Sequence, residues 1–331
     1  MTSTLVLGGT GLLGYHTTLE LLRRGYDVTT VSLPAADVAH IPDEVETLYG
    51  DIMTMTDDEV LSLLAGKHAF FYAIGADERT TPQAPAARFF YEANVVPTQR
   101  LARLARQAGV KKFVLYGSYT AEWGEQWADL GFRSRNGYPR TRLAQEEVAY
   151  LEGDGAMDVM VLRLPYIFGI VPGQRPLWQS FLDIVESQPG QVAVLGGSTS
   201  SVTVRQVAQA AVGAMERGEH GGRYAINAHD LSYVELFGLC CEALGRDPGE
   251  VVVVPLEAVA AAYAEGDAQC QAAGLEHGVH LVDTAAFQDR DATSPRTVGD
   301  VLGIEEDDVV AAIRESLDWC VANPREVLVP A

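Results

Sequence analysis

Long apolar runs are missing from this chain of 331 residues, and basic residues are scarce. No stretch approaches the roughly 18 consecutive apolar residues that span a membrane. The N-terminus shows neither the basic nor the apolar region of a signal peptide. We therefore expect a cytoplasmic protein without a membrane partner, and the length predicts one large domain or two modest ones.

Cysteine and histidine lack the spacing of a metal site. The four cysteines are scattered, and the seven histidines contain no pair of the HExxH type. We expect no bound metal, and reduced, buried thiols at Cys240, Cys241, Cys270 and Cys320.

Acidic residues outnumber basic ones by 45 to 24, which gives a net charge of −21 at pH 7. Nucleic acids and anionic membranes bind basic surfaces, so neither is an expected partner. A small molecule is the favoured partner. Its phosphates would be compatible with this charge, because free N–H groups at a helix N-terminus can bind them.

The most informative stretch is TLVLGGTGLLG, residues 4–14. Residues 4–7 read as a buried strand, and residues 12–24 carry apolar residues at helical spacing. Between them Gly8 permits a sharp turn, Gly11 leaves room for a pyrophosphate, and Gly14 lets the helix pack closely on the strand. This pattern predicts dinucleotide binding.

Strand-like and helix-like runs alternate through the first half of the chain, which favours a Rossmann-type doubly wound parallel sheet. The expected strands are 4–7, 28–32, 45–49, 69–74, 112–117 and 159–164, and the expected helices are 12–24, 57–65, 87–108 and 138–152.

The pattern loosens after Pro165 into a Gly/Pro-rich region, then regains regularity. We expect helices at 204–217 and 232–244, a strand at 223–227, and an alanine-rich helix at 256–274. Thr203 would cap the first of these, and the acids of 305–308 suit the start of a last helix that ends near Asn323. The predicted domains are a Rossmann domain of 1–165 joined by 202–228, and a smaller, partly helical C-terminal substrate lobe of 166–201 and 229–331.

Several motifs in order resemble the extended short-chain dehydrogenase/reductase superfamily, in its NAD-dependent epimerase/dehydratase branch. Besides GGTGLLG they are GDI at 50–52, YAIGA at 72–76, Asn94-Val95, KFVLYGS at 112–118, Tyr138 with Thr141 and Arg142, and LRLPYIFG at 162–169. The last third is similar only in outline, at 202–210 and 222–227.

The resemblance implies a set of cofactor contacts. Asp51 would accept from the adenine amino group, Ile52 would pack on the ring, and Asn94 would brace a buried connection. The full set is Gly8, Thr10, Gly11, Leu12, Leu13, Gly14, Ser32, Asp51, Ile52, Ala73, Ile74, Gly75, Asn94, Tyr138, Arg142, Pro165, Tyr166 and Ile167.

The resemblance also implies a catalytic tyrosine with a cation four residues later on the same helical face. Here they are Tyr138 and Arg142, although the family expects lysine at the second position. A cation helps to bring a phenol into range as a base. Arginine keeps the charge, but it stays protonated and does not readily join a proton relay.

Ser118 is the candidate for the third catalytic residue, which holds the substrate oxygen. Aligning KFV at 112–114 with the family's strand motif and counting along the strand places this residue at Ser118. Anchoring on Trp123-Gly124 selects Tyr119 instead, and Thr120 is a further alternative. Dehydratases of this superfamily place an Asp-Glu pair directly after this residue. Tyr119-Thr120 stands there instead, and Glu122 is expected to be solvated, so dehydration ranks below hydride transfer.

The residue at the end of the second strand distinguishes NAD from NADP, because an acidic side chain there binds the adenosine ribose hydroxyls and a basic one binds a 2′-phosphate. Ser32 is neutral, so the usual acidic residue that excludes NADP is absent, and neither Asp37 nor His40 decides the matter. NADP is favoured over NAD, with dual use left open.

Aromatic residues dominate the predicted substrate wall, which suits an apolar or ring-bearing substrate. The wall comprises 77–81, Trp123, Trp127, Tyr166, Phe168, Arg175 and Trp178. The leading hypothesis is an NAD(P)-dependent oxidoreductase. The alternatives are a nucleotide-sugar epimerase, whose diphosphate would need arginines such as Arg175, Arg205, Arg290 or Arg296, and a non-catalytic NAD(P) sensor. The family also implies a homodimer through 87–108 and 138–152.

Overall fold

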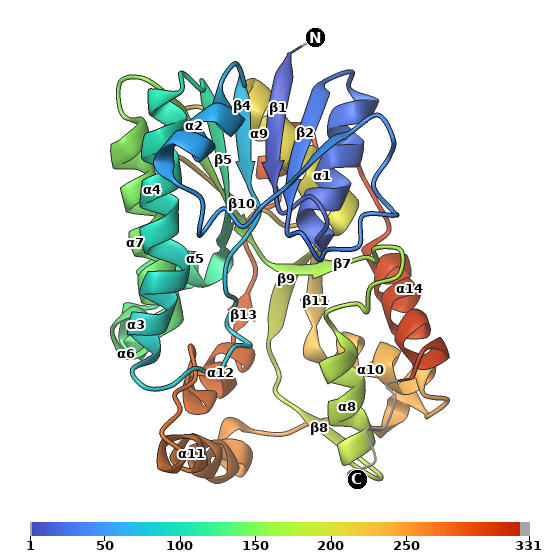
Figure 1. The fold of residues 1–331 in the computed structure, drawn as a ribbon. Coiled ribbons are helices and arrows are strands. Elements are labelled where there is room, and N and C mark those ends of the chain that lie inside the picture. The colour runs from blue at the N-terminus through green and yellow to red at the C-terminus, as the bar shows by residue number, and fades with distance from the viewer. Residues whose placement is uncertain (1, 325–331) are drawn as a thin grey trace, which may run out of the picture.

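The computed structural model describes residues 2–324, and a seven-stranded parallel sheet forms its centre (Figure 1). The strand order is β10-β6-β5-β4-β1-β2-β3, so the chain starts in the interior of the sheet and winds outward in both directions. The predicted doubly wound fold is therefore confirmed. The strands are β1 (Ser3–Leu7), β2 (Asp27–Ser32), β3 (Glu46–Tyr49), β4 (Ala69–Tyr72), β5 (Lys112–Ser118), β6 (Asp158–Leu164) and β10 (Gly222–Ala225).

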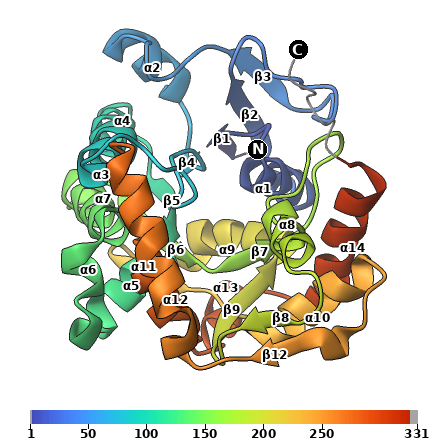
Figure 2. The ribbon, with the colours of Figure 1, turned by 90° about the horizontal axis from the view of Figure 1, so that it is seen from below.

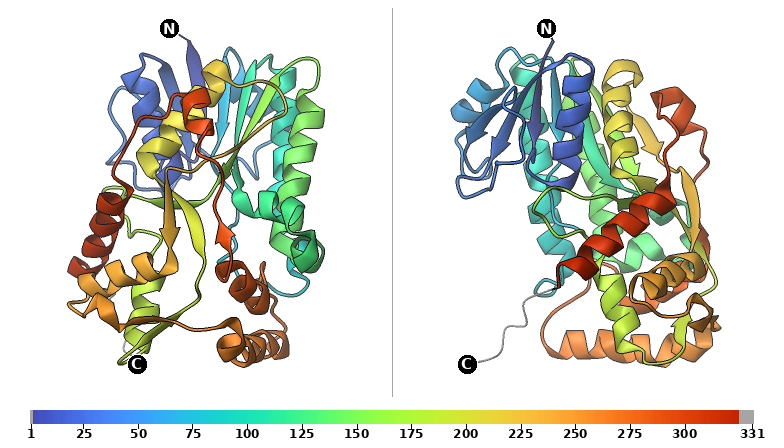
Figure 3. Two further views of the ribbon diagram at one scale, coloured as in Figure 1. Left: turned by 180° about the vertical axis from the view of Figure 1, so that it is seen from behind. Right: turned by 90° about the vertical axis from the view of Figure 1, so that its right-hand side faces the viewer.

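Side chains alternate across this sheet and build one apolar core on each face. Val6 belongs to one core, whereas its neighbours Leu5 and Leu7 belong to the other. Figure 3 shows helices on both sides. The first face carries α1 (Leu12–Arg23), α9 (Val204–Arg217) and α13 (Val298–Leu302), and the second carries α2 (Asp57–Leu64), α4 (Val96–Gln107) and α7 (Gly137–Gly153).

The predicted helix 87–108 is not one continuous α-helix. It consists of α3 (Ala86–Phe90), a π-helical turn over Tyr91–Val95, and α4. Pro97 stands in the first turn of α4 and has no N–H to donate, which explains why regular hydrogen bonding is interrupted before it. The wider turn contains Asn94, whose side chain is fully buried.

The segments beyond the carboxyl ends of the main sheet form the smaller part of the molecule. Its strands make a sheet of β11-β9-β13 with β7 beside β9, and a separate pair of β12 and β8. These strands are β7 (Tyr166–Phe168), β8 (Val192–Val194), β9 (Ser198–Thr203), β11 (His229–Ser232), β12 (Val251–Val253) and β13 (Asp291–Ala292).

Helices surround this smaller part, and Figure 2 shows α11 and α12 along one side of it. They are α5 (Tyr119–Gln126), α6 (Phe132–Arg135), α8 (Gln179–Ser187), α10 (Tyr233–Ala243), α11 (Leu256–Ala272), α12 (Leu281–Gln288) and α14 (Val309–Ala322), with 3-10 turns at Ala128–Leu130 and Pro248–Glu250.

The predicted starts of α9 and α14 are confirmed. Thr203 caps α9 in a reciprocal capping box with Gln206, and Asp308 caps α14 by accepting from the N–H of Ala311. The last helix ends at Ala322 with Asn323 as its C-cap. Within residues 2–324, no helix combines the length and apolar character needed to cross a membrane.

Candidate active site

The glycine turn between β1 and α1 is shaped for a close approach. Gly8 has a φ of +89°, and a Cβ there would lie 2.7 Å from the carbonyl oxygen of Ala73. A Cβ on Gly14 would lie 2.1 Å from the carbonyl oxygen of Gly8. Only glycine fits either position.

The start of α1 fits an anionic group. Gly11 is the N-cap and offers no side-chain cap, and the first turn carries no acidic residue. The first N–H groups of the helix are therefore left for a ligand. Two side chains from distant segments lie at the same turn, since Nε2 of Gln174 donates to the carbonyl oxygen of Thr10 at 2.7 Å and Nε2 of His40 lies 3.3 Å from that oxygen.

The predicted adenosine contacts lie at the ends of β2 and β3. Ser32 is buried, and its Oγ has no hydrogen-bond partner among the described residues. One carboxylate oxygen of Asp51 accepts from the N–H of Met53 at 2.9 Å, and Ile52 packs in the core. The carboxylate of Asp37 likewise accepts from the N–H of Ala39, so it stabilises its own turn.

The loop after β4 carries Ala73, Ile74 and Gly75 towards the glycine turn. Gly75 has a φ of +147°, and a Cβ there would lie 2.7 Å from Oδ1 of Asn94. Asn94 holds this loop, because its Oδ1 accepts from the N–H of Ala76 at 2.8 Å and its Nδ2 donates to the carbonyl of Ala76 at 2.9 Å. Its role is to brace the connection.

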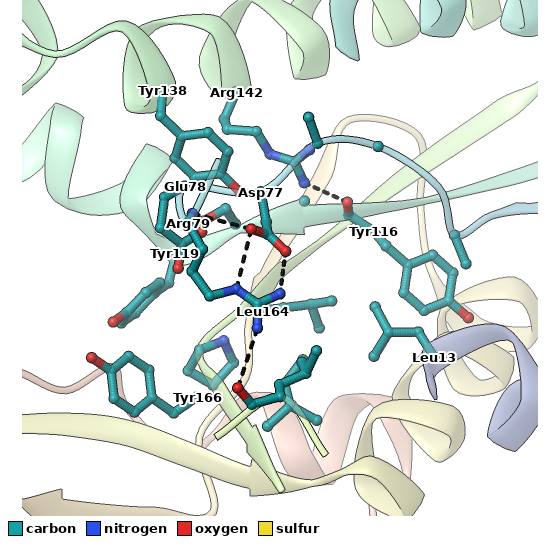
Figure 4. Close-up of a pocket in the computed structure, with 18 of the residues that line it drawn as sticks. Leu13, Asp77, Glu78, Arg79, Tyr116, Tyr119, Tyr138, Arg142, Leu164 and Tyr166 are labelled. Carbon is teal, nitrogen blue, oxygen red and sulfur yellow. Dashed lines mark hydrogen bonds and ion pairs between the residues drawn. The ribbon is translucent and has the colours of Figure 1, made fainter. Parts of the chain in front are cut away.

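A cavity of about 200 Å³ opens beyond the carboxyl ends of β1, β4, β5 and β6 (Figure 4). Such an edge is where open α/β sheets bind ligands. Its walls come from four stretches, namely 73–79, 116–119, 164–167 and 177–178, together with Leu13, Tyr138 and Arg142.

All three predicted catalytic residues line this cavity. Ser118 ends β5 and caps α5, and its Oγ lies 2.9 Å from Oγ1 of Thr120. Tyr138 stands in the first turn of α7, is 3% exposed, and packs edge-on against Phe90 at 5.1 Å between ring centroids. The Ser118 hydroxyl lowers the pKa of the Tyr138 hydroxyl.

Arg142 lies one helical turn after Tyr138, with its Cζ 5.7 Å from the tyrosine ring centroid. It is 6% exposed, which rules out a solvated surface charge. One Nη donates to the carbonyl of Tyr116 at 2.6 Å, and its Nε has no partner among the described residues.

Opposing influences act on the Tyr138 hydroxyl. Burial, the largest of them, raises the pKa of Tyr138, and the nearby Glu78 carboxylate raises it further. The Arg142 guanidinium and the Ser118 hydroxyl lower the pKa. Arg142 therefore stabilises the tyrosinate form, which is the contribution expected of a cation at this position.

Only part of the predicted substrate wall lines the cavity. Tyr166, Trp178 and residues 77–79 do so. Trp123 packs in an aromatic cluster with Tyr119 and Phe287, and Phe168 is fully buried. Arg175 lies away from the cavity, where it donates to Gln179 and stacks on Trp319. Aromatic residues in a sequence do not reveal whether they face a ligand or the core.

The expectation that Glu122 is solvated was wrong. Glu122 is 8% exposed and accepts from Ser294 and from Gln126, both at 2.9 Å. Burial raises the pKa of this carboxyl. Its partner Ser294 comes from 172 positions further along the chain, so local sequence gave no sign of the enclosure.

Sequence reasoning missed several residues that reach the site, including Tyr116, Leu177, His40 as a neighbour of the glycine turn, and Gln174. The period-2 pattern of β5 gives a signal for Tyr116, because it places Tyr116 and Ser118 on one face. The others come from loops, whose course the sequence does not define.

Comparison with known proteins identifies the family. Residues 4–227 match the model of the NAD dependent epimerase/dehydratase family, and the chain belongs to that family of NAD(P)-dependent enzymes. Sterol demethylase protein B of Methylococcus capsulatus is 26% identical over 267 residues, which cover 76% of this chain and 78% of that protein. The UDP-glucose 4-epimerase of Bacillus subtilis is 26% identical over 184 residues, covering 52% and 54% of the two chains.

Solved structures share the fold at lower identity. A nucleoside-diphosphate-sugar epimerase from Pseudomonas aeruginosa has a TM-score of 0.72 at 17% identity, with 97% of this chain and 98% of that chain covered. UDP-glucose 4-epimerase from Bifidobacterium longum, in complex with NAD+ and UDP, has a TM-score of 0.65 at 18% identity, with 98% and 99% covered.

Proposed function

We propose that this enzyme is an NAD(P)-dependent oxidoreductase that interconverts an alcohol and a carbonyl group on a small molecule. The observation that carries the proposal is the convergence of Ser118, Tyr138 and Arg142 on one cavity beyond the glycine turn. The bound dinucleotide would supply the hydride donor or acceptor.

The proton transfer follows from the side chains. The Tyr138 hydroxyl donates a proton to the carbonyl oxygen during reduction, or takes one from the alcohol during oxidation. Ser118 holds the same oxygen by a hydrogen bond. Arg142 stabilises the tyrosinate. Its Nε, which has no partner among the described residues, would donate to a hydroxyl of the nicotinamide ribose. Pro165, Tyr166 and Ile167 line the same cavity and would contact the nicotinamide ring.

The cofactor we propose is NADP, with NAD as a second choice. Ser32 offers a neutral hydroxyl at the position where an acidic residue would repel a 2′-phosphate. Calorimetric titration with both cofactors tests it. Tighter binding of NAD than of NADP would overturn it.

We further propose a cytoplasmic homodimer, with contacts through the helices of 87–108 and 138–152. Large apolar side chains are exposed on these helices at Tyr91, Val96 and Leu151, which supports the proposal. Sedimentation analysis tests it, and a monomer at micromolar concentration would contradict it.

Replacement of Tyr138 by Phe tests the catalytic proposal. We expect kcat for alicyclic ketones to fall by roughly 10²- to 10⁴-fold, while cofactor affinity stays unchanged. Unchanged turnover would remove Tyr138 from the mechanism. A Ser118→Ala variant serves as a second readout, with a smaller loss of kcat.

The relatives favour nucleotide-sugar epimerisation as a second candidate function. It predicts a cofactor retained through purification, with no net change in its redox state. The sensor alternative predicts that neither the natural protein nor Arg142→Lys turns over any alcohol or carbonyl compound in a broad panel, although both bind the cofactor.

A further inference from the structure

The two cations on the cavity wall leave no charge assigned to a substrate, because one is ion-paired and the other is assigned to the cofactor. Among the described residues that line the cavity, Arg79 and Arg142 carry positive charge. Arg79 pairs with Asp77 through two of its nitrogens, and a third lies 3.5 Å from the carbonyl of Leu177 (Figure 4). Arg142 donates to the carbonyl of Tyr116, and its Nε, which has no partner among the described residues, is the donor assigned above to the cofactor.

The four arginines considered above as partners for the diphosphate of a nucleotide sugar have other partners in the structure. Each of three forms an ion pair with an aspartate: Arg205 with Asp307, Arg290 with Asp129 and Arg296 with Asp230. Arg175, as described above, donates to Gln179 and stacks on Trp319. A phosphorylated substrate would therefore meet no free cation from this set.

Glu78 adds a negative group to the same wall. It lines the cavity, and Figure 4 shows it on the same side as Tyr138 and Tyr119. Its carboxyl accepts from its own backbone N–H, and it forms no ion pair among the described residues. Its charge acts on the hydroxyls of Tyr119, Tyr138 and Tyr166, which places it within electrostatic reach of all three. Burial raises the pKa of the carboxyl.

Apart from Ser118, the remaining lining is apolar or aromatic. Leu164, Pro165 and Leu177 offer no polar side chain, and the rings of Tyr166 and Trp178 stack at 4.8 Å between centroids. Such a wall binds the faces of rings and gives an anion no compensation for the water it loses.

We propose that the cavity takes an uncharged, ring-bearing alcohol or ketone, and that Glu78 determines this specificity by rejecting anionic substrates. This inference rests on the proposed oxidoreductase function. An ionised Glu78 repels a phosphate or carboxylate directly, and a neutral Glu78 hydrogen-bonds to an uncharged oxygen. The aromatic residues of the wall thus favour ring-bearing substrates, and Glu78 on the same wall disfavours anionic ones.

A matched pair of ligands tests the proposal, namely methyl 4-oxocyclohexanecarboxylate and the corresponding carboxylate. They share the ring and the ketone and differ in charge. Binding to the NADP+-loaded protein is measured by calorimetry, and kcat/KM for reduction is measured with NADPH. Glu78→Gln removes the charge at the site, and Glu44→Gln removes the same charge from an exposed position outside the cavity.

We expect the natural protein and Glu44→Gln to favour the ester by about tenfold or more, in binding and in kcat/KM. Glu78→Gln should reduce that preference at least about threefold, because the carboxylate ligand should bind more tightly and be reduced with a higher kcat/KM. Equal use of both ligands by the natural protein, or a Glu78→Gln preference equal to that of Glu44→Gln, would overturn the inference, as would binding of neither ligand. Selective binding of the ester without turnover would contradict the oxidoreductase proposal and support the specificity assignment.

Discussion

Two arginines are buried to nearly the same extent in this molecule, but their surroundings differ. Arg163 on β6 is 5% exposed and donates to Glu146 at 3.0 and 2.7 Å, with Glu125 at 2.8 Å. Arg142 on α7 is 6% exposed and forms no ion pair among the described residues. Within residues 2–324, its guanidinium makes one hydrogen bond, and its Nε has no partner.

This difference indicates that the charge of Arg163 serves the structure, whereas that of Arg142 is available to a ligand. A buried charge is destabilising unless it is paired, and Arg163 is paired with carboxylates of the protein. Arg142 does not, although it lies beside Tyr138 in a cavity. The unpaired donor is consistent with a site that is completed by the cofactor, and the predictions below test this contrast.

The largest effect on stability is expected from Arg163→Met. This change leaves the carboxylate of Glu146, which is 1% exposed, without its bidentate partner. We expect the free energy of unfolding, measured by urea denaturation, to fall by about 3–5 kcal/mol. The double variant Arg163→Met with Glu146→Leu should recover most of the loss. A fall below about 1 kcal/mol in the single variant would mean that the pair is not essential.

Arg142→Met should show the reverse pattern. Removal of an incompletely paired charge is expected to change the free energy of unfolding by less than about 1 kcal/mol, whereas kcat/KM for ketone reduction falls by roughly 10²-fold. Urea denaturation and steady-state kinetics on one preparation provide both numbers. Strong destabilisation with retained activity would assign Arg142 to the structure instead.

The same variant should shift the pH dependence of alcohol oxidation. Oxidation needs the tyrosinate, so log kcat/KM rises with pH until Tyr138 has lost its proton. Arg142 lowers the pKa of Tyr138, and its removal therefore raises that pKa. We expect the rising limb in Arg142→Met to move to higher pH by about one unit or more. Arg142→Lys should stay near the natural profile, and a shift to lower pH in Arg142→Met would contradict the assigned role.

A smaller contrast of the same kind exists on β2. Thr30 and Ser32 are both buried. Oγ1 of Thr30 donates to the carbonyl of Val6 at 3.0 Å, whereas Oγ of Ser32 has no partner in the described part of the chain. Ser32→Ala should therefore leave stability unchanged and weaken NADP binding by about three- to tenfold. Thr30→Val is the matched control and should affect stability more than cofactor affinity. The opposite assignment of the two effects would refute this interpretation of Ser32.

The cofactor half of the molecule was more predictable from sequence than the substrate half. The strand at 4–7, the glycines and the helix after them are local and consecutive, so their pattern predicts their structure. The catalytic spacing of Tyr138 and Arg142 is also local, since it depends on one helix.

The substrate wall is assembled from segments that are distant in sequence. Glu122 pairs with Ser294, and Arg79 reaches Leu177, over separations that no local pattern records. Predicted strand and helix ends also moved by one or two residues, because terminal residues depend on tertiary contacts. The π-helical turn before Pro97 was missed for a different reason, since the apolar spacing there suits an uninterrupted helix.

A crystal structure of the protein with bound NADP+ would test the central claim most directly. We predict that the Nε of Arg142 lies within hydrogen-bond distance of a nicotinamide ribose hydroxyl, with the Tyr138 hydroxyl facing the nicotinamide C4 side of the cavity. The pyrophosphate should lie at the N-terminus of α1. A cofactor bound elsewhere, or an Arg142 whose only partner is still the carbonyl of Tyr116, would contradict the account.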